Sequence, residues 1–483
     1  MKLFELADAV RDTGRLLGNG QVEIEALCTD SRKAKPGTLF FCIPGLRTDG
    51  HIFAPMAFEA GAAALVVERR LDIDCPQLIV KDVREALALI AACFYGHPAR
   101  EMKLIGITGT KGKTTTSYLV KSILEKAGYK TGLIGTVGSM IGETHIPTAL
   151  TTPDPTDFQS LLRQMADAGV EYVVMEVSAH ALALRKLSGI RFEAAAFTNL
   201  SQDHFDLFGN FDRYLAAKLR LFEPDMCARA VYNADDERVS GGMKQVKIPA
   251  EGYAIRVPAQ IYAKDIDVNE RGCTFQLNFH KRYRLDVTLH LSGIFNVYNS
   301  LTAAALCDAL GIGAESIRAG LEDVKNVPGR IELLDTDTPY RVILDYAHSP
   351  DALENILKTV RQTARARVIA LFGCGGDRDH DKRPVMGEIG GRLADYCILT
   401  SDNPRGEDPY DILKQIEEGI RQTDCAYTVI ENRREAIRYA MNMAEPGDVI
   451  VLAGKGHETY QEIRGVKYPF DEKVVVRELL EEI

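Results

Sequence analysis

The sequence has no excess of basic residues and no long apolar segment. Its 483 residues carry a formal net charge of -10 without a run of like charges, which argues against a nucleic-acid-binding surface. No stretch approaches the roughly 18 uninterrupted apolar residues that a transmembrane helix needs. The N-terminus, MKLFELADAV, carries Glu5 and Asp8 where a signal peptide would be apolar. We therefore expect neither a signal peptide nor membrane insertion.

Paired-cysteine motifs are also missing. The ten cysteines are scattered along the chain, and no two of them form C-x-x-C. This pattern favours reduced thiols in a cytoplasmic protein over disulfides or a zinc site. The rest of the composition, 46% hydrophobic and 26% charged, is ordinary for a globular enzyme.

The chain is too long for one hydrophobic core, so about three domains are expected. Short apolar runs alternate with helical patterns, which predicts an α/β fold class. A buried strand at 102–108 opens a second domain, and the Pro-Gly pair within 325–330 is typical of a linker. Further predicted elements are strands at 38–43, 63–68 and 76–80, a helical stretch from residue 83 that ends at Gly96 and Pro98, and a β-rich segment at 246–292. Beyond the linker, strand–loop–helix units recur, and their glycine-bearing loops should share one edge of a parallel sheet.

Residues 106–115, GITGTKGKTT, look like a phosphate-binding loop with altered spacing. A Walker A loop ending in Lys113-Thr114 needs glycine at 107, where this chain has Ile107. The glycines still let backbone N–H groups converge on phosphate, and the following helix directs its positive end at them. Lys113 can neutralise the β- and γ-phosphates, and the Thr114 hydroxyl can ligate Mg²⁺. The predicted nucleotide-binding residues of the loop are Gly109, Thr110, Lys111, Gly112, Lys113, Thr114 and Thr115.

The apolar strand before G-K-T-T disfavours the simpler interpretation, a plain glycine turn. The compact spacing is the form found in Mur ligases and folylpolyglutamate synthetases, and it favours an ATP-dependent amide ligase. By itself it leaves a P-loop kinase possible.

Two side chains near the predicted strand ends suggest a metal site. Glu176 ends the strand YVVMEV, and His204 follows the strand AAAFTN, so a carboxylate and an imidazole are expected beside the phosphate loop. Each alone would be unremarkable. Lys218, in YLAAKLRLF, would without this context be an ordinary helix lysine that extends its ammonium to solvent.

A dozen motifs occur in the order that the Mur ligase family has them, which is far more specific than any one of them. They are TDSR, GTKGKTT, TTPDP, MEVSAH, TNLSQDH, AAKLRLF, GIFNVYN, PGR, DYAHSP, GGDRD, SDNPR and GKGHE. The chain resembles this family along almost its entire length. Within the family it is most similar to the ligases that add meso-2,6-diaminopimelate to UDP-N-acetylmuramoyl-L-alanyl-D-glutamate in peptidoglycan assembly.

The resemblance implies three domains. It implies an N-terminal UDP-sugar-binding domain at 1–100, a central P-loop ATPase-type α/β domain at 101–327 and a C-terminal Rossmann-like amino-acid-binding domain at 328–483. It further implies an ATP-dependent acid–amino-acid ligase that uses Mg²⁺, acts on small molecules in the cytoplasm and works as a monomer.

The same resemblance implies roles for particular residues. Lys218 would be carbamylated, which turns a cation into a carboxylate-like ligand for a second Mg²⁺. The implied metal ligands are Thr114, Glu176, His204 and Lys218, and the implied catalytic residues are Lys113, Lys218, His204 and Arg330. Asn296, Arg330 and Asp345 would serve the nucleotide, Arg330 also stabilising the transferring phosphoryl charge, and His348 would lie close to them.

Substrate contacts are implied in the same way. Ser31 would touch the uridine moiety, and Thr151, Thr152 and Ser178 would contact the muramoyl-dipeptide. The implied pocket for the incoming amino acid consists of Arg378, Asp402, Asn403, Pro404, Arg405, Gly454 and Glu458.

Some positions depart from the family pattern. EVSSH is common where this chain has EVSAH, Gln is frequent where Leu184 stands, and Phe208 replaces a usual histidine. Lys186 occupies a position where arginine is frequent in the family. The contact of that arginine to the muramoyl-peptide is therefore made by Lys186 or Arg185, or it is lost. No role is assigned to Leu184 or Phe208.

Asp402-Asn403-Pro404-Arg405 bears on the choice of amino acid. Lysine and diaminopimelate both carry a distal amine, but only diaminopimelate adds a carboxylate, which the planar fork of Arg405 matches. Glu458 can accept the distal ammonium. In the resembling family D-N-P-R marks the diaminopimelate enzymes, although a proline turn with a solvated arginine is the simpler interpretation.

The remaining alternatives for the function of the chain are an L-lysine-adding ligase, a folylpolyglutamate synthetase, which the TDSR domain disfavours, and a P-loop switch or inactive ATP-binding regulator.

Overall fold

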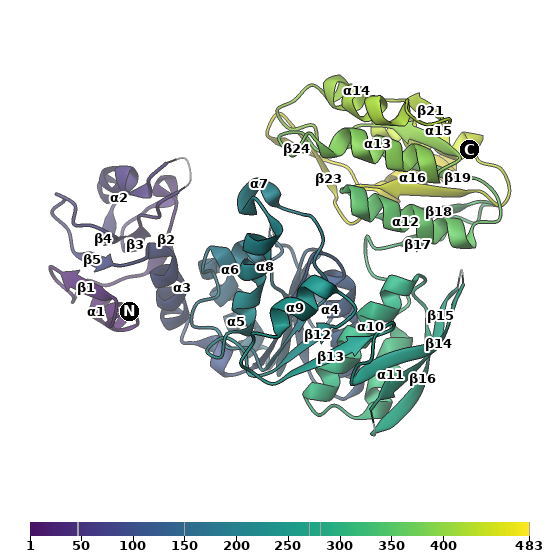
Figure 1. Ribbon diagram of the computed structural model, residues 1–483. Helices are drawn as coiled ribbons and strands as arrows, with labels where there is room; N and C mark the ends of the chain where they lie inside the picture. Colours follow the sequence, from purple (N-terminus) through teal and green to yellow (C-terminus); the bar gives the residue numbers. More distant parts are fainter. Residues whose placement is uncertain (46–47, 149, 270, 281, 483) are drawn as a thin grey trace. The chain divides into compact units, whose positions relative to one another are not determined.

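The computed structural model describes residues 1–45, 48–148, 150–269, 271–280 and 282–482. Figure 1 labels the helices and strands of the chain, which forms two compact units. The first comprises Met1–Tyr262, Asn278–Tyr283 and Tyr298–Gly320, and the second comprises Ala263–Leu277, Arg284–Val297 and Leu321–Ile483. The predicted domain boundaries after residues 100 and 327 stay predictions.

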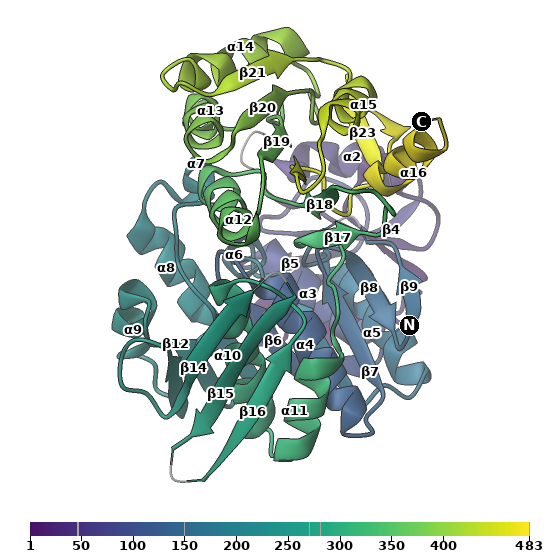
Figure 2. The same cartoon turned by 90° about the vertical axis from the view of Figure 1, so that its right-hand side faces the viewer.

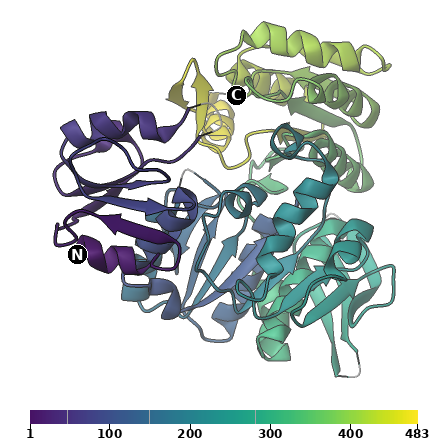
Figure 3. The same ribbon diagram turned by 60° about the vertical axis from the view of Figure 1, so that its left-hand side comes forward.

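The N-terminal part of the first unit is a five-stranded sheet in the order β1-β5-β4-β3-β2, drawn in purple in Figure 3. Its strands are β1 (Gly14–Leu17), β2 (Ala26–Cys28), β3 (Thr38–Phe41), β4 (Ala62–Val67) and β5 (Gln77–Val80), and its helices are α1 (Leu3–Asp8), α2 (Ala54–Glu59) and α3 (Val83–Phe94). Alternate residues of β3 enter different clusters: Leu39 and Phe41 pack with α1 and α3, and Phe40 packs with α2. Both faces are therefore covered, as the continuous apolar runs of the predicted strands indicate.

The second sheet has eleven strands in the order β16-β15-β14-β13-β12-β11-β6-β10-β7-β8-β9. They are β6 (Lys103–Thr108), β7 (Thr131–Gly135), β8 (Gly138–Ile141), β9 (Thr144–Ile146), β10 (Tyr172–Glu176), β11 (Ala194–Phe197), β12 (Ala230–Asn233), β13 (Ala250–Ala254), β14 (Ile261–Asn269), β15 (Gly272–Phe279) and β16 (Tyr283–Leu289). The last three form the predicted β-rich segment and run side by side in Figure 2. The helices of this part are α4 (Lys113–Lys126), α5 (Pro155–Asp167), α6 (Ala179–Ala183), α7 (Phe205–Phe208), α8 (Phe211–Leu219), α9 (Glu237–Met243), α10 (Ile294–Ala309) and α11 (Ala314–Asp323).

The third sheet, within the second unit, has the order β17-β18-β22-β19-β20-β21. Its strands are β17 (Glu332–Leu334), β18 (Arg341–Asp345), β19 (Val368–Phe372), β20 (Tyr396–Leu399), β21 (Ala426–Val429) and β22 (Val449–Ala453); a separate hairpin consists of β23 (Tyr460–Ile463) and β24 (Val466–Pro469). Helices α12 (Pro350–Thr363), α13 (Lys382–Leu393) and α14 (Pro409–Ile420) pack on one face, and α15 (Arg433–Met443) and α16 (Glu472–Glu482) pack on the other. This layered arrangement matches the strand–loop–helix units that the sequence predicts.

Sheet topology determines where ligands can bind. Strand β6 lies between β10 and β11 and runs parallel to both, so the chain crosses over in opposite directions around it. Strands β18, β22, β19 and β20 are likewise parallel neighbours. Ligands of open α/β sheets bind at the carboxyl ends of such strands, and the predicted site loops after β6, β10, β11, β18, β20 and β22 follow carboxyl ends.

Candidate functional site

The phosphate loop leaves β6 in a conformation that requires glycine. Gly109 has φ +146° and Gly112 has φ +83°, both in the left-handed region that side chains rarely adopt. A Cβ at Gly109 would overlap the Thr198 hydroxyl, and one at Gly112 would overlap the Asn299 side chain. The loop backbone thus lies directly against its neighbours, and α4 begins at Lys113 immediately after it.

The end of β11 holds the loop in place. Asn199 Oδ1 accepts a hydrogen bond from the Lys111 N–H at 2.8 Å, and its Nδ2 donates to the Lys111 carbonyl at 3.0 Å. Thr198 Oγ1 donates to the same carbonyl at 2.7 Å. These two residues belong to the motif TNLSQDH, in which sequence reasoning assigned a role only to His204. Their position at the end of a predicted strand could have indicated that they lie beside the glycine loop.

Two lysines converge on the loop carbonyls. Lys113 Nζ donates to Gly109 O at 2.9 Å and Thr110 O at 3.0 Å, while Lys218 Nζ, from α8, also donates to Gly109 O at 2.9 Å. Lys218 is 1% exposed, so it is no solvated helix lysine. Burial, followed by the charge of Lys113, lowers the pKa of the Lys218 ammonium well below its ordinary value. A neutral amine is therefore accessible at this position.

The buried Glu176 carboxylate ends β10 beside the loop strand. Its two oxygens accept hydrogen bonds from the Thr136 N–H and hydroxyl, both at 2.9 Å, and Thr136 Oγ1 lies 3.1 Å from Thr151 Oγ1. Thr152 Oγ1 donates to the Glu176 carbonyl at 2.9 Å and accepts from the Ser178 N–H at 3.1 Å. The structure thus brings Thr151, Thr152 and Ser178 together around Glu176. Thr136 is a neighbour that the sequence analysis did not name.

His204 lies at the start of α7, with φ +56°. Its ring centroid is 4.6 Å from that of His180 and 6.2 Å from that of Tyr214, which also lies beneath the Lys218 ammonium. Desolvation lowers the pKa of the His204 imidazole, and the charges of Lys113 and Lys218 act in the same direction. A neutral imidazole is the form that ligates metal.

The donor set around the loop offers oxygen ligands for one hard cation, and it suits a second one only if Lys218 is modified. Among the described residues no three His, Cys, Asp or Glu side chains form a metal-binding group. The Thr114 hydroxyl and the Glu176 carboxylate are oxygen donors of the kind that Mg²⁺ prefers, whereas an ammonium cannot coordinate a cation. A carbamate on Lys218 would supply the missing anionic oxygens, so the residues fit the metal in that form.

The two basic residues that could replace the family's arginine have different partners. Lys186 Nζ lies 2.7 Å from Asp154 Oδ1, next to the threonines of TTPDP. Arg185 pairs with Asp82 at 3.1 Å and Glu85 at 3.0 Å. Ser31, the predicted uridine contact, is buried at the start of a 3-10 helix, and its Oγ lies 3.7 Å from Met56 Sδ.

In the second unit, three of the residues predicted to lie near the nucleotide are found around the carboxyl end of β18. The Arg330 guanidinium lies over the Tyr346 ring at 5.1 Å, and Asp345 Oδ2 accepts from the Ile331 N–H at 2.8 Å. The His348 ring is 4.6 Å from the Tyr346 ring. Arg330, Asp345 and His348 are therefore close together, with Tyr346 as an unpredicted centre. Asn296 lies apart in sequence at the start of α10, where its Nδ2 donates to Ser292 O at 2.8 Å.

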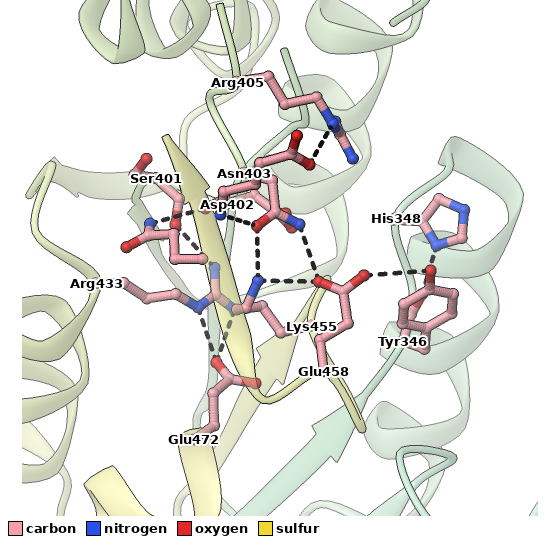
Figure 4. A network of polar contacts seen from close by, with 12 residues as sticks. Tyr346, His348, Ser401, Asp402, Asn403, Arg405, Arg433, Lys455, Glu458 and Glu472 are labelled. Atoms are coloured by element: carbon pink, nitrogen blue, oxygen red, sulfur yellow. Dashed lines mark hydrogen bonds and ion pairs between the residues drawn. The ribbon is translucent and has the colours of Figure 1, made fainter. Parts of the chain in front are cut away.

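The loops after β20 and β22 are joined by a buried charge network (Figure 4). Lys455, fully buried, donates to Asn403 Oδ1 at 3.1 Å and Glu458 Oε2 at 3.0 Å. Asn403 Nδ2 donates to the same Glu458 oxygen at 2.9 Å. The predicted Asn403 and Glu458 are thus brought together, and Lys455 is the residue that sequence reasoning missed, although it stands inside the quoted motif GKGHE.

Below this network, a second ion pair fixes the points where the two loops leave β20 and β22. Arg433 and Glu472, both fully buried, pair at 2.8 Å. The Arg433 guanidinium also donates to Ser401 O at 3.3 Å, as Figure 4 shows, and to Ala453 O at 2.9 Å, near the ends of the two strands that precede the loops. Asp402 and Gly454 follow these carbonyls directly. A Cβ at Gly454 would crowd the Asp402 carboxylate, which explains the glycine.

Asp402 and Arg405 are the predicted ligand-reading groups of this region. Asp402 is 6% exposed, yet among the described residues no side chain or N–H donates to its carboxylate. Arg405 donates from Nε to Glu462 Oε2 at 3.2 Å and from Nη1 to Gly376 O at 3.0 Å. Gly376 also packs flat against Pro404, because a Cβ there would overlap the Pro404 carbonyl. Arg378, in contrast, is exposed and has no hydrogen bond within the described part of the chain.

Comparison with known proteins gives matches along the whole chain. Three family models match in order: Mur ligase family, catalytic domain, at 23–95; Mur ligase middle domain at 107–307; and Mur ligase, glutamate ligase domain, at 329–456. A relative from Caldanaerobacter subterraneus subsp. tengcongensis, named UDP-N-acetylmuramoyl-L-alanyl-D-glutamate–2,6-diaminopimelate ligase, is 45% identical over 100% of this chain and 99% of its own.

Solved structures agree. One of a ligase with that same name has a TM-score of 0.68 and 32% identity, and the match covers 96% of each chain. Folylpolyglutamate synthase from Mycobacterium tuberculosis, complexed with ADP and AMPPCP, has a TM-score of 0.65 over 77% of this chain and 93% of its own. At 18% identity that likeness shows the fold alone. The predicted three-domain α/β fold class is confirmed.

Proposed function

This chain belongs to the Mur ligase family, and we propose that it adds meso-2,6-diaminopimelate to the D-glutamate of UDP-N-acetylmuramoyl-L-alanyl-D-glutamate at the expense of ATP. The observation that carries the proposal is the 45% identity, over the full length, to a relative of that name. The glycine loop with Lys113 and Lys218 on its carbonyls supports the ATP requirement.

The chemistry proceeds in two steps. The D-glutamate carboxylate attacks the γ-phosphorus of ATP, the bond from that phosphorus to the β–γ bridging oxygen breaks, and an acyl phosphate and ADP form. The diaminopimelate amine then attacks the acyl carbon, loses a proton, and expels inorganic phosphate. Activation is needed because a free carboxylate repels a nucleophile and has no leaving group. Phosphoryl transfer depends mainly on positioning and on stabilising charge, which is the role proposed for Lys113 and Arg330.

Mg²⁺, when bound, would supply positive charge against the phosphate oxygens. Thr114, Glu176, His204 and carbamylated Lys218 would hold it. Thr136 positions the Glu176 carboxylate by donating to both of its oxygens. Thr151, Thr152 and Ser178 would bind the muramoyl-dipeptide, and the ion pair of Lys186 with Asp154 favours Lys186 over Arg185 as the additional basic contact.

We further propose that the enzyme acts as a monomer in the cytoplasm. The described residues contain no helix long and apolar enough to cross a membrane.

Lys218 is expected to be carbamylated in the active enzyme. Its neutral amine would add to CO₂ and lose a proton, and the lowering of its pKa by burial favours that neutral form. Lys218→Ala should lose on the order of 10²-fold in activity, because an anionic ligand disappears from the phosphate site. Short carboxylic acids added to the assay should restore part of it. A high-resolution structure of active enzyme with a bare ammonium at Lys218 would contradict the modification.

A ligation assay tests the function as a whole. The enzyme is supplied with ATP, Mg²⁺ and the UDP-muramoyl-dipeptide, then with meso-diaminopimelate, L-lysine or another amino acid in turn, and phosphate and product are measured. We expect phosphate release to require an amino acid and to be fastest with meso-diaminopimelate. Preference for lysine would indicate the lysine-adding ligase instead. Hydrolysis of ATP that needs no amine would indicate a P-loop switch.

A further inference from the structure

The hairpin β23–β24 is attached to the loop that reads the amino acid. Its two-residue turn, Arg464-Gly465, has φ +50° and +78°, as a type I′ turn requires, and pairs Ile463 with Val466. A turn of this kind fixes the register of both strands. Glu462 therefore has a defined place on β23, opposite Lys467.

Backbone hydrogen bonds connect this strand to the D-N-P-R segment. The Arg405 N–H donates to Glu462 O at 3.0 Å, and the Arg464 N–H donates to Arg405 O at 2.7 Å. The Glu462 N–H donates to Asn403 Oδ1 at 2.9 Å. Arg405 itself has φ +49°, a left-handed conformation that is unfavourable for arginine and persists only where surrounding contacts hold it. Glu462 of β23 and Arg464 of the turn supply those contacts.

The Glu462 side chain adds a bond to the guanidinium. Its Oε2 accepts from Arg405 Nε at 3.2 Å, and Gly376 O accepts from Nη1 at 3.0 Å. Lys467, the cross-strand neighbour, lies instead over the Tyr460 ring at 4.0 Å, so Glu462 makes its ion pair with Arg405. Of the five N–H donors of an arginine, one on Nη1 and both on Nη2 are then left for a ligand.

We propose that Glu462 is a positioning residue for amino-acid selection: it holds the guanidinium of Arg405 by Nε so that the Nη edge faces the distal carboxylate of diaminopimelate. The inference rests on the proposed function, in which Arg405 reads that carboxylate. Without Glu462, only the bond to the Gly376 carbonyl would hold the guanidinium, and the substrate would have to supply the rest of its ordering, which costs affinity for substrates that use it. Lysine has no distal carboxylate, so its use should not depend on Glu462.

The test is a double-mutant cycle with Glu462→Ala, Arg405→Ala and the double variant, measured with saturating ATP and UDP-muramoyl-dipeptide. Glu462→Ala should raise the KM for meso-diaminopimelate about tenfold with little change in kcat, and should leave kcat/KM for L-lysine unchanged. In the Arg405→Ala background, Glu462→Ala should have no further effect. Glu462→Gln keeps an oxygen acceptor for Nε and should recover most of the affinity.

Glu418→Ala, an exposed glutamate on α14 of the same unit, is the matched control and should behave as wild type. A general structural role of Glu462 would impair both amino acids alike and would overturn the proposal. So would additive effects in the cycle, an unchanged KM in Glu462→Ala, or a lowered KM, which would make Glu462 a competitor of the substrate carboxylate. Wild-type enzyme that adds no meso-diaminopimelate would overturn the proposed function together with this inference, whereas an active wild type with an unaffected Glu462→Ala variant overturns this inference alone.

Discussion

Arg405→Ala is expected to remove most of a strong preference for meso-diaminopimelate over L-lysine. The wild-type preference should reach about 10⁴-fold, because a site built to hydrogen-bond a carboxylate is left unpaired by a substrate that lacks it. The geometry supports this assignment: Arg405 is held by Glu462 and Gly376 O, with donors remaining for a ligand. Parallel measurements of kcat/KM for the two amino acids give the ratio directly.

Charge balance strengthens the expectation. Glu458 is already paired with Lys455, and Arg405 with Glu462, so the charges of these two predicted ligand-binding side chains are matched. A zwitterionic end group preserves that balance, whereas the lone ammonium of lysine adds an uncompensated charge beside arginine. Arg392→Ala, on an exposed ion pair of α13, serves as the control. If the wild-type enzyme adds lysine as efficiently as diaminopimelate, the assignment of this pocket is wrong.

Sequence reasoning found the parts of this site that depend on local pattern. The apolar run before Gly109 predicted a buried strand, and the glycines at 109 and 112 predicted a tight loop, which the structure confirms with left-handed φ values at both. The order of the motifs predicted the three-domain fold. Short consecutive stretches of sequence determine these features, so predicting them requires no tertiary information.

The missed residues are those whose importance arises only from packing. Lys455 reads as an ordinary loop lysine, but the fold buries it completely between Asn403 and Glu458. Asn199 clamps the phosphate loop across 88 positions of sequence, and Glu462 reaches Arg405 across 57. No periodicity or spacing rule connects residues so far apart, because only the tertiary structure brings them together: β11 lies next to β6, and β23 bonds to the loop that holds Arg405. For Lys218, burial bears on a residue that the sequence did name. Its 1% exposure argues against a solvated helix lysine and supports the predicted role at the phosphate site.

Lys113→Ala should abolish formation of the acyl phosphate while leaving the fold intact. Lys113 is the first residue of α4, where its ammonium lies over the carbonyls of Gly109 and Thr110 rather than in the apolar core. From there it can reach bound phosphate, and removing its charge should cost on the order of 10³-fold or more in rate. Lys126→Ala, an exposed lysine at the other end of the same helix, should keep wild-type activity and shows that a changed α4 is tolerated. Circular dichroism and thermal unfolding check that both variants are folded. Lys111 is the other residue of the loop with a mobile positive charge, so Lys111→Ala is measured in parallel. Near-normal turnover in folded Lys113→Ala would refute the ATP-site assignment.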